Sequence, residues 1–218
     1  MEIITLEVAG LKPALKGARN PMNSWHLIDS CYDENGNFVI GEKDNDLAQR
    51  LIIAGSEHMK FMRQIQVWAD MDMTRFFWSE FDTYKFNTKN SCSTIHKLLN
   101  PKNEVTMDMF DIYEEDFDVV APVINRINEI RIKFLESNDY EEKCYLKRRA
   151  KTLLFESFLQ LRTVNTNYAE IRNVVIQRKN HQMKKDWIDT FCKWATTLPY
   201  SRELIFCGLD EYYDKFSS

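Results

Sequence analysis

Glycine and proline are scarce in this sequence. Only six glycines and five prolines occur among 218 residues, and a turn-rich β-sandwich or barrel uses more of both at its turns. The scarcity therefore favours a mainly helical chain. The few that occur mark breaks: Gly10 and Pro13 end a strand-like segment, and Asn35-Gly36 is typical of a tight turn.

Cysteine is present, but in no pattern that would form disulfides or bind a metal. The five cysteines are odd in number and widely spread, and no two have the spacing of a zinc knuckle or a redox motif. There is also no apolar leader and no apolar run approaching the roughly 18 residues of a membrane span. We therefore expect free thiols, no membrane association and a cytoplasmic location.

A large excess of charge of one sign is absent as well. The chain has 29 Lys and Arg against 33 Asp and Glu, which gives a net charge of −4 and a pI near 5.7. This balance argues against a partner that is a nucleic acid polymer, although a local basic pocket is compatible with it. Hydrophobic residues make up 44% of the chain, enough to bury a core, so we expect a single domain over residues 1–218.

Hydrophobic periodicity predicts a small sheet near the N-terminus and helices after it. Strand-like patterns occur at Ile3–Val8 and at Phe61–Ala69. The chain between Gly17 and Gly41 is expected to be irregular. The fold class expected is α+β, mainly helical. Helical patterns occupy five segments: Asp44–Ala54, Phe117–Leu135, Tyr140–Leu161, Thr163–Lys179 and Asp186–Leu198.

The segment Trp78–His96 carries the strongest functional signal. It combines aromatic rings, carboxylates and lysine with many small hydroxyl and amide side chains. Short polar groups beside a cation suit a loop that holds a phosphate or a heterocycle. A solvated polar loop is the alternative interpretation.

Other candidate sites have structural explanations that compete with the functional ones. Glu80 and Asp82 could form an acid–base pair, or could cap and be solvated. Cys92 lies four residues before His96, but proximity in sequence is poor evidence for a thiol nucleophile. The four histidines lack metal-ligand spacing, so no metal site is expected. The basic cluster at residues 147–151 could grip phosphate or form an exposed helix face.

The segment Thr83–His96 resembles the signature of the flavin-dependent thymidylate synthases. That signature runs Arg-His-Arg, two free positions, Ser, one free position, Asn-Glu, one free position, Ser, one free position and Arg-Tyr. Asn90 and Ser93 are identical to the pattern, and Glu80 stands where the family has a glutamine. The frame is filled without a gap by Thr83-Tyr84-Lys85, Thr88, Asn90-Ser91, Ser93 and Ile95-His96.

A second block has the spacing of the same family. The family has an arginine that opens an Arg-x-x-Leu-Pro turn, then two flavin-contacting asparagines, then a substrate-polarising arginine. Lys151, Asn167, Asn173 and Arg178 stand at the corresponding intervals of 16, 6 and 5 residues. Asn165 offers a rival register for the first asparagine. Asn167 and Arg178 are about three helical turns apart, so we expect them to share a helix face.

The resemblance covers roughly residues 2–187 and implies an α+β fold with a small antiparallel sheet. It implies an FAD-dependent enzyme that moves a one-carbon unit from methylenetetrahydrofolate to carbon 5 of a pyrimidine deoxynucleotide, most simply converting dUMP to dTMP. NADPH would reduce the flavin. It also implies a homotetramer with shared active sites, and the many aromatic residues suit either a buried interface or an ordinary core.

The resemblance further implies a role for individual residues. Arg178 would be the catalytic residue, because it would polarise the pyrimidine carbonyl. The substrate would contact Glu80, Ser91, Ser93, Lys151 and Arg178, with Ser93 and Lys151 on its phosphate. The flavin would contact Thr83, Tyr84, Lys85, Asn90, Asn167 and Asn173.

Three positions depart from the family pattern. Thr83 replaces the leading arginine, Ser91 the glutamate and Ile95 the arginine that grips the substrate phosphate. Isoleucine cannot form the charge-assisted fork of an arginine. Two further hypotheses follow: a related enzyme that takes another pyrimidine nucleotide or leaves a hydroxymethyl group, and a binding or regulatory homologue without catalysis.

Overall fold

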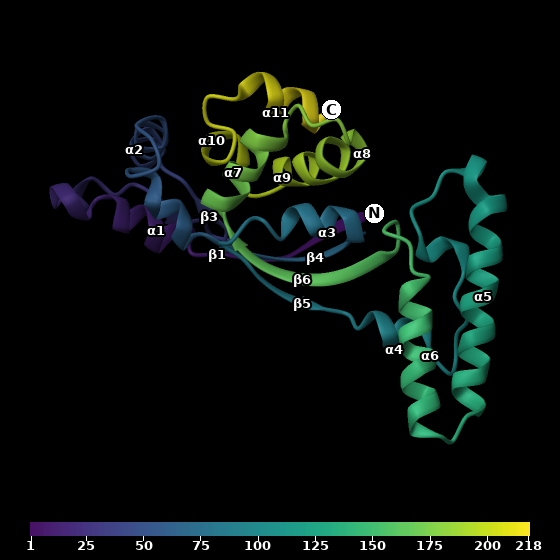
Figure 1. Ribbon diagram of the computed structural model, residues 1–218. Helices are drawn as coiled ribbons and strands as arrows, with labels where there is room; N and C mark the ends of the chain where they lie inside the picture. Colours follow the sequence, from purple (N-terminus) through teal and green to yellow (C-terminus); the bar gives the residue numbers. More distant parts are fainter. The chain divides into compact units, whose positions relative to one another are not determined.

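The computed structural model describes all 218 residues, and Figure 1 shows how the elements are arranged. The strands are β1 Glu2–Ala9, β2 Cys31–Tyr32, β3 Phe38–Val39, β4 Gln66–Thr74, β5 Thr88–Ser91 and β6 Leu159–Asn167. The longer helices are α1 Leu11–Ala18, α2 Glu42–Ile53, α3 Arg75–Phe81, α4 Thr94–Leu98, α5 Phe117–Glu136, α6 Tyr140–Thr152, α7 Tyr168–Arg178 and α11 Asp210–Ser217. Short helical segments are η3 Met59–Gln64, α8 Lys184–Asp186, the π-helical η6 Trp187–Cys192, α9 Lys193–Thr196 and α10 Ser201–Leu204.

Four strands form the main sheet, in the order β1-β4-β6-β5. The other two strands form a separate antiparallel hairpin, with Cys31 opposite Val39 and Tyr32 opposite Phe38. A small antiparallel sheet within a mainly helical chain confirms the α+β class expected from the sequence.

The chain divides into two compact units. Unit 1 comprises residues 1–2, 71–83 and 90–162, and unit 2 comprises residues 3–70, 84–89 and 163–218. Each strand of the main sheet contributes residues to both units. The expectation of a single domain over residues 1–218 stays a prediction.

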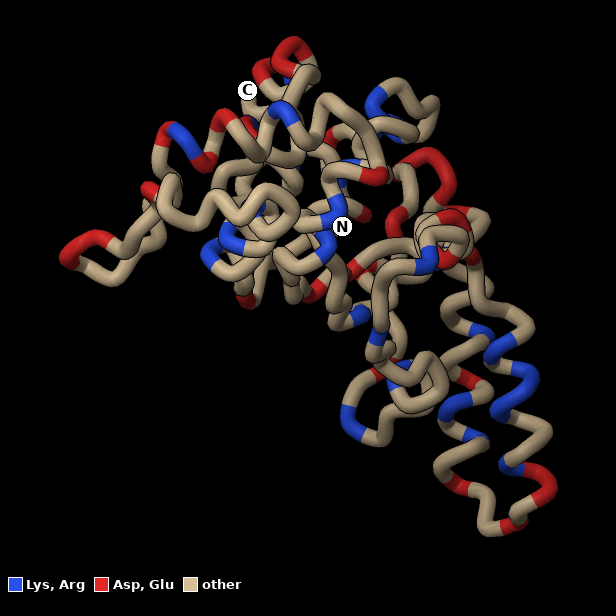
Figure 2. The backbone as a smooth tube through the Cα atoms, turned by 90° about the vertical axis from the view of Figure 1, so that its left-hand side faces the viewer, with Lys and Arg blue, Asp and Glu red and all other residues tan.

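Unit 1 is built around the hairpin of α5 and α6. Ile124, Ile127 and Ile130 lie on one face of α5 at helical spacing, and they share a buried cluster with Leu146 and Ala150 of α6. Burial of this apolar stripe is what stabilises two helices that are otherwise rich in charge. Lys and Arg positions recur along both helices of the hairpin, as Figure 2 shows.

Unit 2 contains α1, α2 and the C-terminal helices. A buried ion pair joins α2 to the chain just after α1, with Arg19 Nε 2.6 Å from Asp44 Oδ1. Helix α9 is tied to β1, because Trp194 Nε1 donates to Thr5 Oγ1 at 2.9 Å. Figure 1 shows α7 to α11 gathered on one side of β1. Helix α7, which carries most of the candidate site, is tied to the C-terminal segment, because Tyr168 Oη donates to the Pro199 carbonyl and Arg172 Nη1 to the Ile205 carbonyl, each at 2.7 Å.

Some boundaries expected from the sequence are wrong. The strand expected at Phe61–Ala69 begins only at Gln66, because η3 occupies the preceding residues. The helices expected at Tyr140–Leu161 and Thr163–Lys179 are separated by β6, which both predictions overlooked. Helix α1 lies partly in the segment expected to be irregular. The helices expected near residues 44–54, 117–135 and 186–198 are confirmed.

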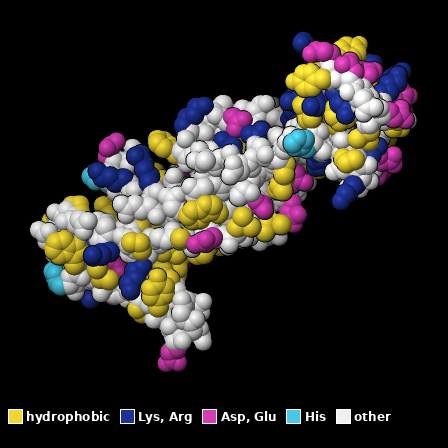
Figure 3. Space-filling model, turned by 90° about the horizontal axis from the view of Figure 1, so that it is seen from below, with side chains coloured by type: hydrophobic (Ala, Val, Ile, Leu, Met, Phe, Trp, Pro, Cys, Tyr) yellow, Lys and Arg dark blue, Asp and Glu magenta, His cyan; other side chains and the backbone are white.

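The surface carries hydrophobic as well as charged side chains, and Figure 3 shows them on one face of the molecule. Ile4 and Leu6 of β1 are more than half exposed. None of the helices combines the length and hydrophobicity that crossing a membrane requires. All five cysteines are free, and no group of three or more His, Cys, Asp or Glu side chains is arranged to hold a metal ion.

Candidate functional site

Helix α7 begins with a side-chain cap at the end of β6. Asn167 Oδ1 accepts a hydrogen bond from the Glu170 N–H at 3.0 Å, and Asn167 Nδ2 donates to the Phe86 carbonyl at 3.3 Å. An asparagine at this position satisfies an N–H that the first turn of a helix leaves unpaired. Asn167 therefore precedes the helix, which corrects the expectation that it shares a helix face with Arg178.

Five side chains form a continuous hydrogen-bonded chain along α7, which we call the α7 chain. Arg178 Nε donates to Tyr84 Oη at 2.9 Å, and Tyr84 Oη donates to Gln177 Oε1 at 3.1 Å. Gln177 Nε2 then donates to Asn173 Oδ1 at 3.0 Å, and Asn173 Nδ2 donates to Glu170 Oε2 at 3.4 Å. Every donor points from the guanidinium toward the carboxylate, so the dipoles favour a cation at one end and an anion at the other.

Aromatic rings surround the guanidinium of Arg178. Its central carbon lies 4.3 Å from the ring centroid of Trp187 and 5.7 Å from that of Tyr84. Arg178 Nη1 is 2.9 Å from His181 Nε2. Stacking and hydrogen bonding together hold the guanidinium in one orientation. A cation held in this way is suited to polarising a carbonyl group of a ligand.

A cavity of about 180 Å³ opens beside the start of α7. Phe86, one of its walls, is 61% exposed, and the Arg63 guanidinium lies 5.3 Å from its ring centroid. An exposed ring, a cation, a carboxylate and amides meet here, which is typical of a ligand site. The lining residues all belong to unit 2, and they are Ser56, Met59, Arg63, Phe86, Asn167, Ala169, Glu170 and Asn173.

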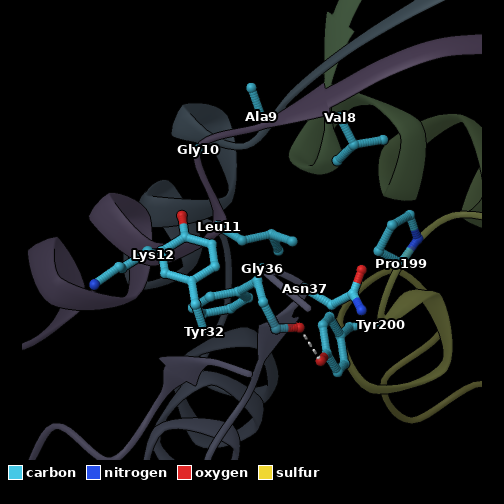
Figure 4. A pocket seen from close by; sticks show the side chains of 11 residues that line it. Val8, Ala9, Gly10, Leu11, Lys12, Tyr32, Gly36, Asn37, Pro199 and Tyr200 are labelled. Atoms are coloured by element: carbon cyan, nitrogen blue, oxygen red, sulfur yellow. Dashed lines mark hydrogen bonds between the residues drawn. The ribbon is translucent and has the colours of Figure 1, made fainter. Parts of the chain in front are cut away.

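A larger cavity, of about 660 Å³, lies at the end of β1 (Figure 4). Its Tyr200 hydroxyl is engaged by the fold, since it donates to the Phe38 carbonyl at 2.7 Å and accepts from the Ile40 N–H at 3.2 Å. Lys12 is its one charged lining residue, and in Figure 4 the ammonium points away from Tyr200. None of the residues that the resemblance assigns lines this cavity, so the smaller cavity is the better candidate.

The residues assigned by the resemblance fall in both units. Unit 2 contains Tyr84, Lys85, Asn167, Asn173 and Arg178. The structure joins Tyr84, Asn173 and Arg178 in the α7 chain and places Asn167 at the adjoining cavity, whereas Lys85 is exposed. Unit 1 contains the remaining residues, which are Glu80, Thr83, Asn90, Ser91, Ser93 and Lys151.

The two asparagines considered for the first position, Asn165 and Asn167, lie in different surroundings. Asn167 lines the cavity. Asn165 lies on β6, where its Nδ2 is 3.3 Å from Gln66 Oε1 and 3.4 Å from the Val67 carbonyl. Both side chains are engaged within the fold, Asn165 with β4 and Asn167 with the start of α7 and the Phe86 carbonyl. The register of the first asparagine stays a prediction.

Within unit 1, local contacts explain part of the signature segment. Ser93 is the N-cap of α4, and its Oγ accepts from the His96 N–H at 3.4 Å. Thr83 Oγ1 donates to the Glu80 carbonyl at 2.7 Å. The binding roles of these residues stay predictions. Three others are exposed: Asn90, Ser91 and Lys151.

Sequence reasoning missed several residues of the site, above all Glu170. Its position three residues after Asn167 matches the Asn-x-x-Glu spacing of a capping box, a signal that could have drawn attention to it. Phe86 and Trp187 gave no such signal, because only the fold brings them next to α7. Phe86 lies just before β5, and Trp187 is the first residue of η6, beyond the end of α7.

Comparison with known proteins defines the class of fold. No family model matches the chain, and no curated protein matches it. Among solved structures, the chain has the fold of the flavin-dependent thymidylate synthases.

The matching structures include two of the flavin-dependent thymidylate synthase ThyX from Helicobacter pylori, each with FAD and dUMP. They superpose with TM-scores of 0.66 and 0.67 at 20% and 19% sequence identity. The matches cover 94% and 95% of this chain and 98% of each ThyX chain. The shared fold therefore extends over nearly the whole length of both proteins.

Proposed function

We propose that this protein is a flavin-dependent enzyme that transfers a one-carbon unit from methylenetetrahydrofolate to carbon 5 of a pyrimidine deoxynucleotide, most simply dUMP. The α7 chain is the observation that carries the proposal. It links Tyr84, Asn173 and Arg178, three residues that the resemblance assigns to the site, although Tyr84 and Arg178 are 94 residues apart. The fold shared with the FAD- and dUMP-bound ThyX structures supports it.

The residues of the cavity fit one part of FAD. The amides of Asn167 and Asn173 can pair with the edge of a heterocycle, and the exposed ring of Phe86 offers a face for stacking. The Arg63 guanidinium suits an anionic group of the same ligand. With Tyr84, these residues would hold the flavin, while Thr83, Lys85 and Asn90 of the signature segment are proposed further contacts.

The cavity is too small to hold the whole cofactor. A volume of about 180 Å³ is below the roughly 300–1,000 Å³ that bind a drug-sized ligand, so a dinucleotide needs further walls. We propose a homotetramer whose subunits share the active sites, with NADPH as the reductant. Exposed apolar side chains such as Ile4 and Leu6 supply surface for such contacts.

The proposed chemistry divides between the cofactor and the chain. Bound FAD, once reduced by NADPH, supplies the reducing equivalents that complete the methyl group. Arg178 donates hydrogen bonds to a pyrimidine carbonyl and stabilises the charge that develops on the ring. Trp187, Tyr84 and His181 keep its guanidinium oriented for this task.

The residues proposed to bind the substrate phosphate include few positive charges. Ser93 and Lys151 are proposed to hold it, with Ser91 and Glu80 nearby, whereas Ile95 cannot. A missing charged contact costs about 1–3 kcal/mol, so dUMP should bind about tenfold to hundredfold more weakly than to a protein with the full signature.

Glu80 favours a second candidate substrate. A carboxylate accepts a hydrogen bond from an exocyclic amine, which cytosine has and uracil lacks. A cytosine nucleotide is therefore the alternative substrate, and a protein that binds without catalysis is the alternative function. Titration of the FAD-loaded protein with dUMP and dCMP, for wild type and Glu80→Gln, separates the substrates. Preference for dCMP that disappears in Glu80→Gln supports the alternative, and unchanged tight binding of dUMP excludes it.

Replacing Arg178 tests the catalytic assignment. We predict that Arg178→Ala retains FAD but loses on the order of 10² or more in turnover, as when one preorganised electrostatic contact is removed. Lys179→Ala is the matched control, because Lys179 is the next residue and its ammonium lies over the Tyr212 ring, 4.0 Å from the centroid. Turnover of Arg178→Ala equal to that of Lys179→Ala would exclude Arg178 as the catalytic residue.

A further inference from the structure

Glu170 is a buried carboxylate at the wall of the cavity beside α7. Only 5% of its surface is exposed. Its Oε1 accepts from the Phe86 N–H at 3.2 Å, and its Oε2 accepts from Asn173 Nδ2 at 3.4 Å. Neither donor is a cation, and Glu170 forms no ion pair. Two hydrogen bonds therefore fix the carboxylate in place, but no counter-charge neutralises it.

The structure of α7 does not require this charge. In a capping box the Glu side chain accepts from the N–H of the cap residue, here Asn167, whereas Glu170 turns to Phe86, 84 residues away in the sequence. A neutral glutamine can accept the same N–H and can pair with the Asn173 amide through its own amide group. The cost of burying a carboxylate without a cation exceeds the stabilisation that a helix dipole gives. The charge therefore needs an explanation other than the structure of α7.

The charge acts on whatever occupies the cavity. Glu170 and Arg63 are the charged residues among those that line it. Arg63 is exposed, so water and salt screen its guanidinium, whereas a buried carboxylate is screened far less. The positive end of the α7 dipole offsets only about half of a unit charge. A fixed negative charge therefore dominates the cavity, and it disfavours a ligand state that is more negative.

We propose that Glu170 sets the reduction equilibrium of a flavin held at this cavity and favours its oxidised form. This inference rests on the proposed function, in which residues of the cavity wall contact the flavin. Two electrons pass from NADPH, which is oxidised, to the flavin ring, where a nearby negative charge disfavours the reduced state. Coulomb's law with an effective dielectric constant of about 20 gives an effect of about tenfold to hundredfold for charges about 6–10 Å apart. For a two-electron couple this lowers the reduction potential by about 30–60 mV.

The test is the reduction potential of the flavin in the FAD-loaded, full-length protein, measured by equilibration with a reference dye and read from the flavin absorbance. Glu170→Gln removes the charge and keeps the shape, whereas Glu170→Asp keeps the charge. Glu211→Gln is the matched control, because Glu211 also lies in the first turn of a helix, α11, but is exposed and does not line the cavity. The melting temperature of each variant without FAD reports whether the fold is kept.

We expect the equilibrium constant for reduction to rise about tenfold to hundredfold in Glu170→Gln and to stay close to wild type in Glu170→Asp and Glu211→Gln. An unchanged potential in Glu170→Gln would overturn the proposal. An equal rise in Glu170→Asp would also overturn it, because the shape of the side chain and not its charge would then be responsible. If Glu170→Gln does not fold or does not retain FAD, the wild type decides: its bound flavin should have a lower potential than free FAD, and an equal or higher potential would overturn the proposal.

Conversion of dUMP and dCMP is assayed on the same preparations, so that the proposed function is scored separately. Potentials that change as expected in a protein that converts neither nucleotide support this inference and count against the proposed enzyme. Turnover of a nucleotide, with identical potentials in wild type and Glu170→Gln, supports the enzyme and overturns the inference. A wild-type protein that does not retain FAD overturns both.

Discussion

Tyr84 joins the two halves of the α7 chain, and removing its hydroxyl tests whether the chain stabilises the protein. The side chain is buried, its Oη accepts from Arg178 Nε at 2.9 Å and it donates to Gln177 Oε1 at 3.1 Å. In Tyr84→Phe the ring that stacks against Arg178 is kept, and both hydrogen bonds are lost. The substitution therefore isolates the hydroxyl from the packing of the ring.

The magnitude follows from the two bonds. A hydrogen bond to a charged group contributes about 1.5–3 kcal/mol, and one between neutral groups about 1 kcal/mol. Arg178 is half-buried and Gln177 is exposed, so water replaces part of what is lost. We expect a loss of about 1–2 kcal/mol in the free energy of unfolding. For a chain of this size that lowers the melting temperature by roughly 2–8 °C.

Urea and thermal unfolding of the purified protein measure the change. Tyr145→Phe is the matched control, because Tyr145 is an exposed tyrosine on α6 and should change stability by no more than about 0.5 kcal/mol. In a double-mutant cycle with Arg178→Gln, the two substitutions should be less than additive, since both break the same bond. If Tyr84→Phe were as stable as wild type, or if the two substitutions were fully additive, the α7 chain would not be a coupled unit.

Three further predictions concern the rest of the molecule. Burial raises the pKa of Asp44, but hydrogen bonds from Ser30 and Arg19 outweigh it and leave the pKa lowered. The stability that this carboxylate contributes is complete above its unfolded pKa of about 3.9 and is lost as the pH falls toward the lower folded pKa. The free energy of unfolding measured across this acidic range should therefore show a decline that Asp44→Asn lacks. Ile127 is fully buried between α5 and α6, so Ile127→Ala should lower the unfolding free energy by about 2–5 kcal/mol in urea melts, and a loss below 1 kcal/mol would contradict the packing described. Burial raises the pKa of Cys192 to about 12, so this thiol should resist a thiol reagent at about pH 8 until the protein unfolds, whereas labelling of Cys192 as fast as the exposed cysteines would contradict its burial.

The sequence predicted the helices whose apolar residues recur regularly, and it failed where two patterns compete. The α5 periodicity of Ile124, Ile127 and Ile130 matches the observed buried face. In β6, Leu159–Asn167 alternates in the way a strand does, with Val164 and Thr166 buried. That alternation was hidden between two helical segments, because short apolar runs fit either period.

Helix α1 was missed for a different reason. Pro13 lies in its first turn, where proline costs little because the N–H it lacks would have no partner. Read in isolation, a proline close after a glycine indicated a break. The glycine itself, Gly10, does require its conformation: its φ is +93°, and a Cβ there would lie 2.4 Å from the Gln64 carbonyl oxygen.

The candidate site was predictable only where spacing along one helix defines it. Asn173 and Arg178 lie on α7, so their separation in sequence fixes their separation in space. Glu170 and Phe86 meet because β5, β6 and α7 bring together segments 84 residues apart. No local pattern encodes such a contact, so the pairing of Glu170 with Phe86 was found only in the structure.

The central claim is that the chain binds a flavin and a pyrimidine nucleotide, and the absorbance spectrum of the purified protein tests it most directly. The protein is incubated with FAD, freed of excess and scanned in the visible range, then titrated with dUMP and dCMP. We expect retained flavin absorbance that shifts as one of the two nucleotides binds. A protein that stays colourless after incubation with FAD would contradict the proposed enzyme, whatever its fold.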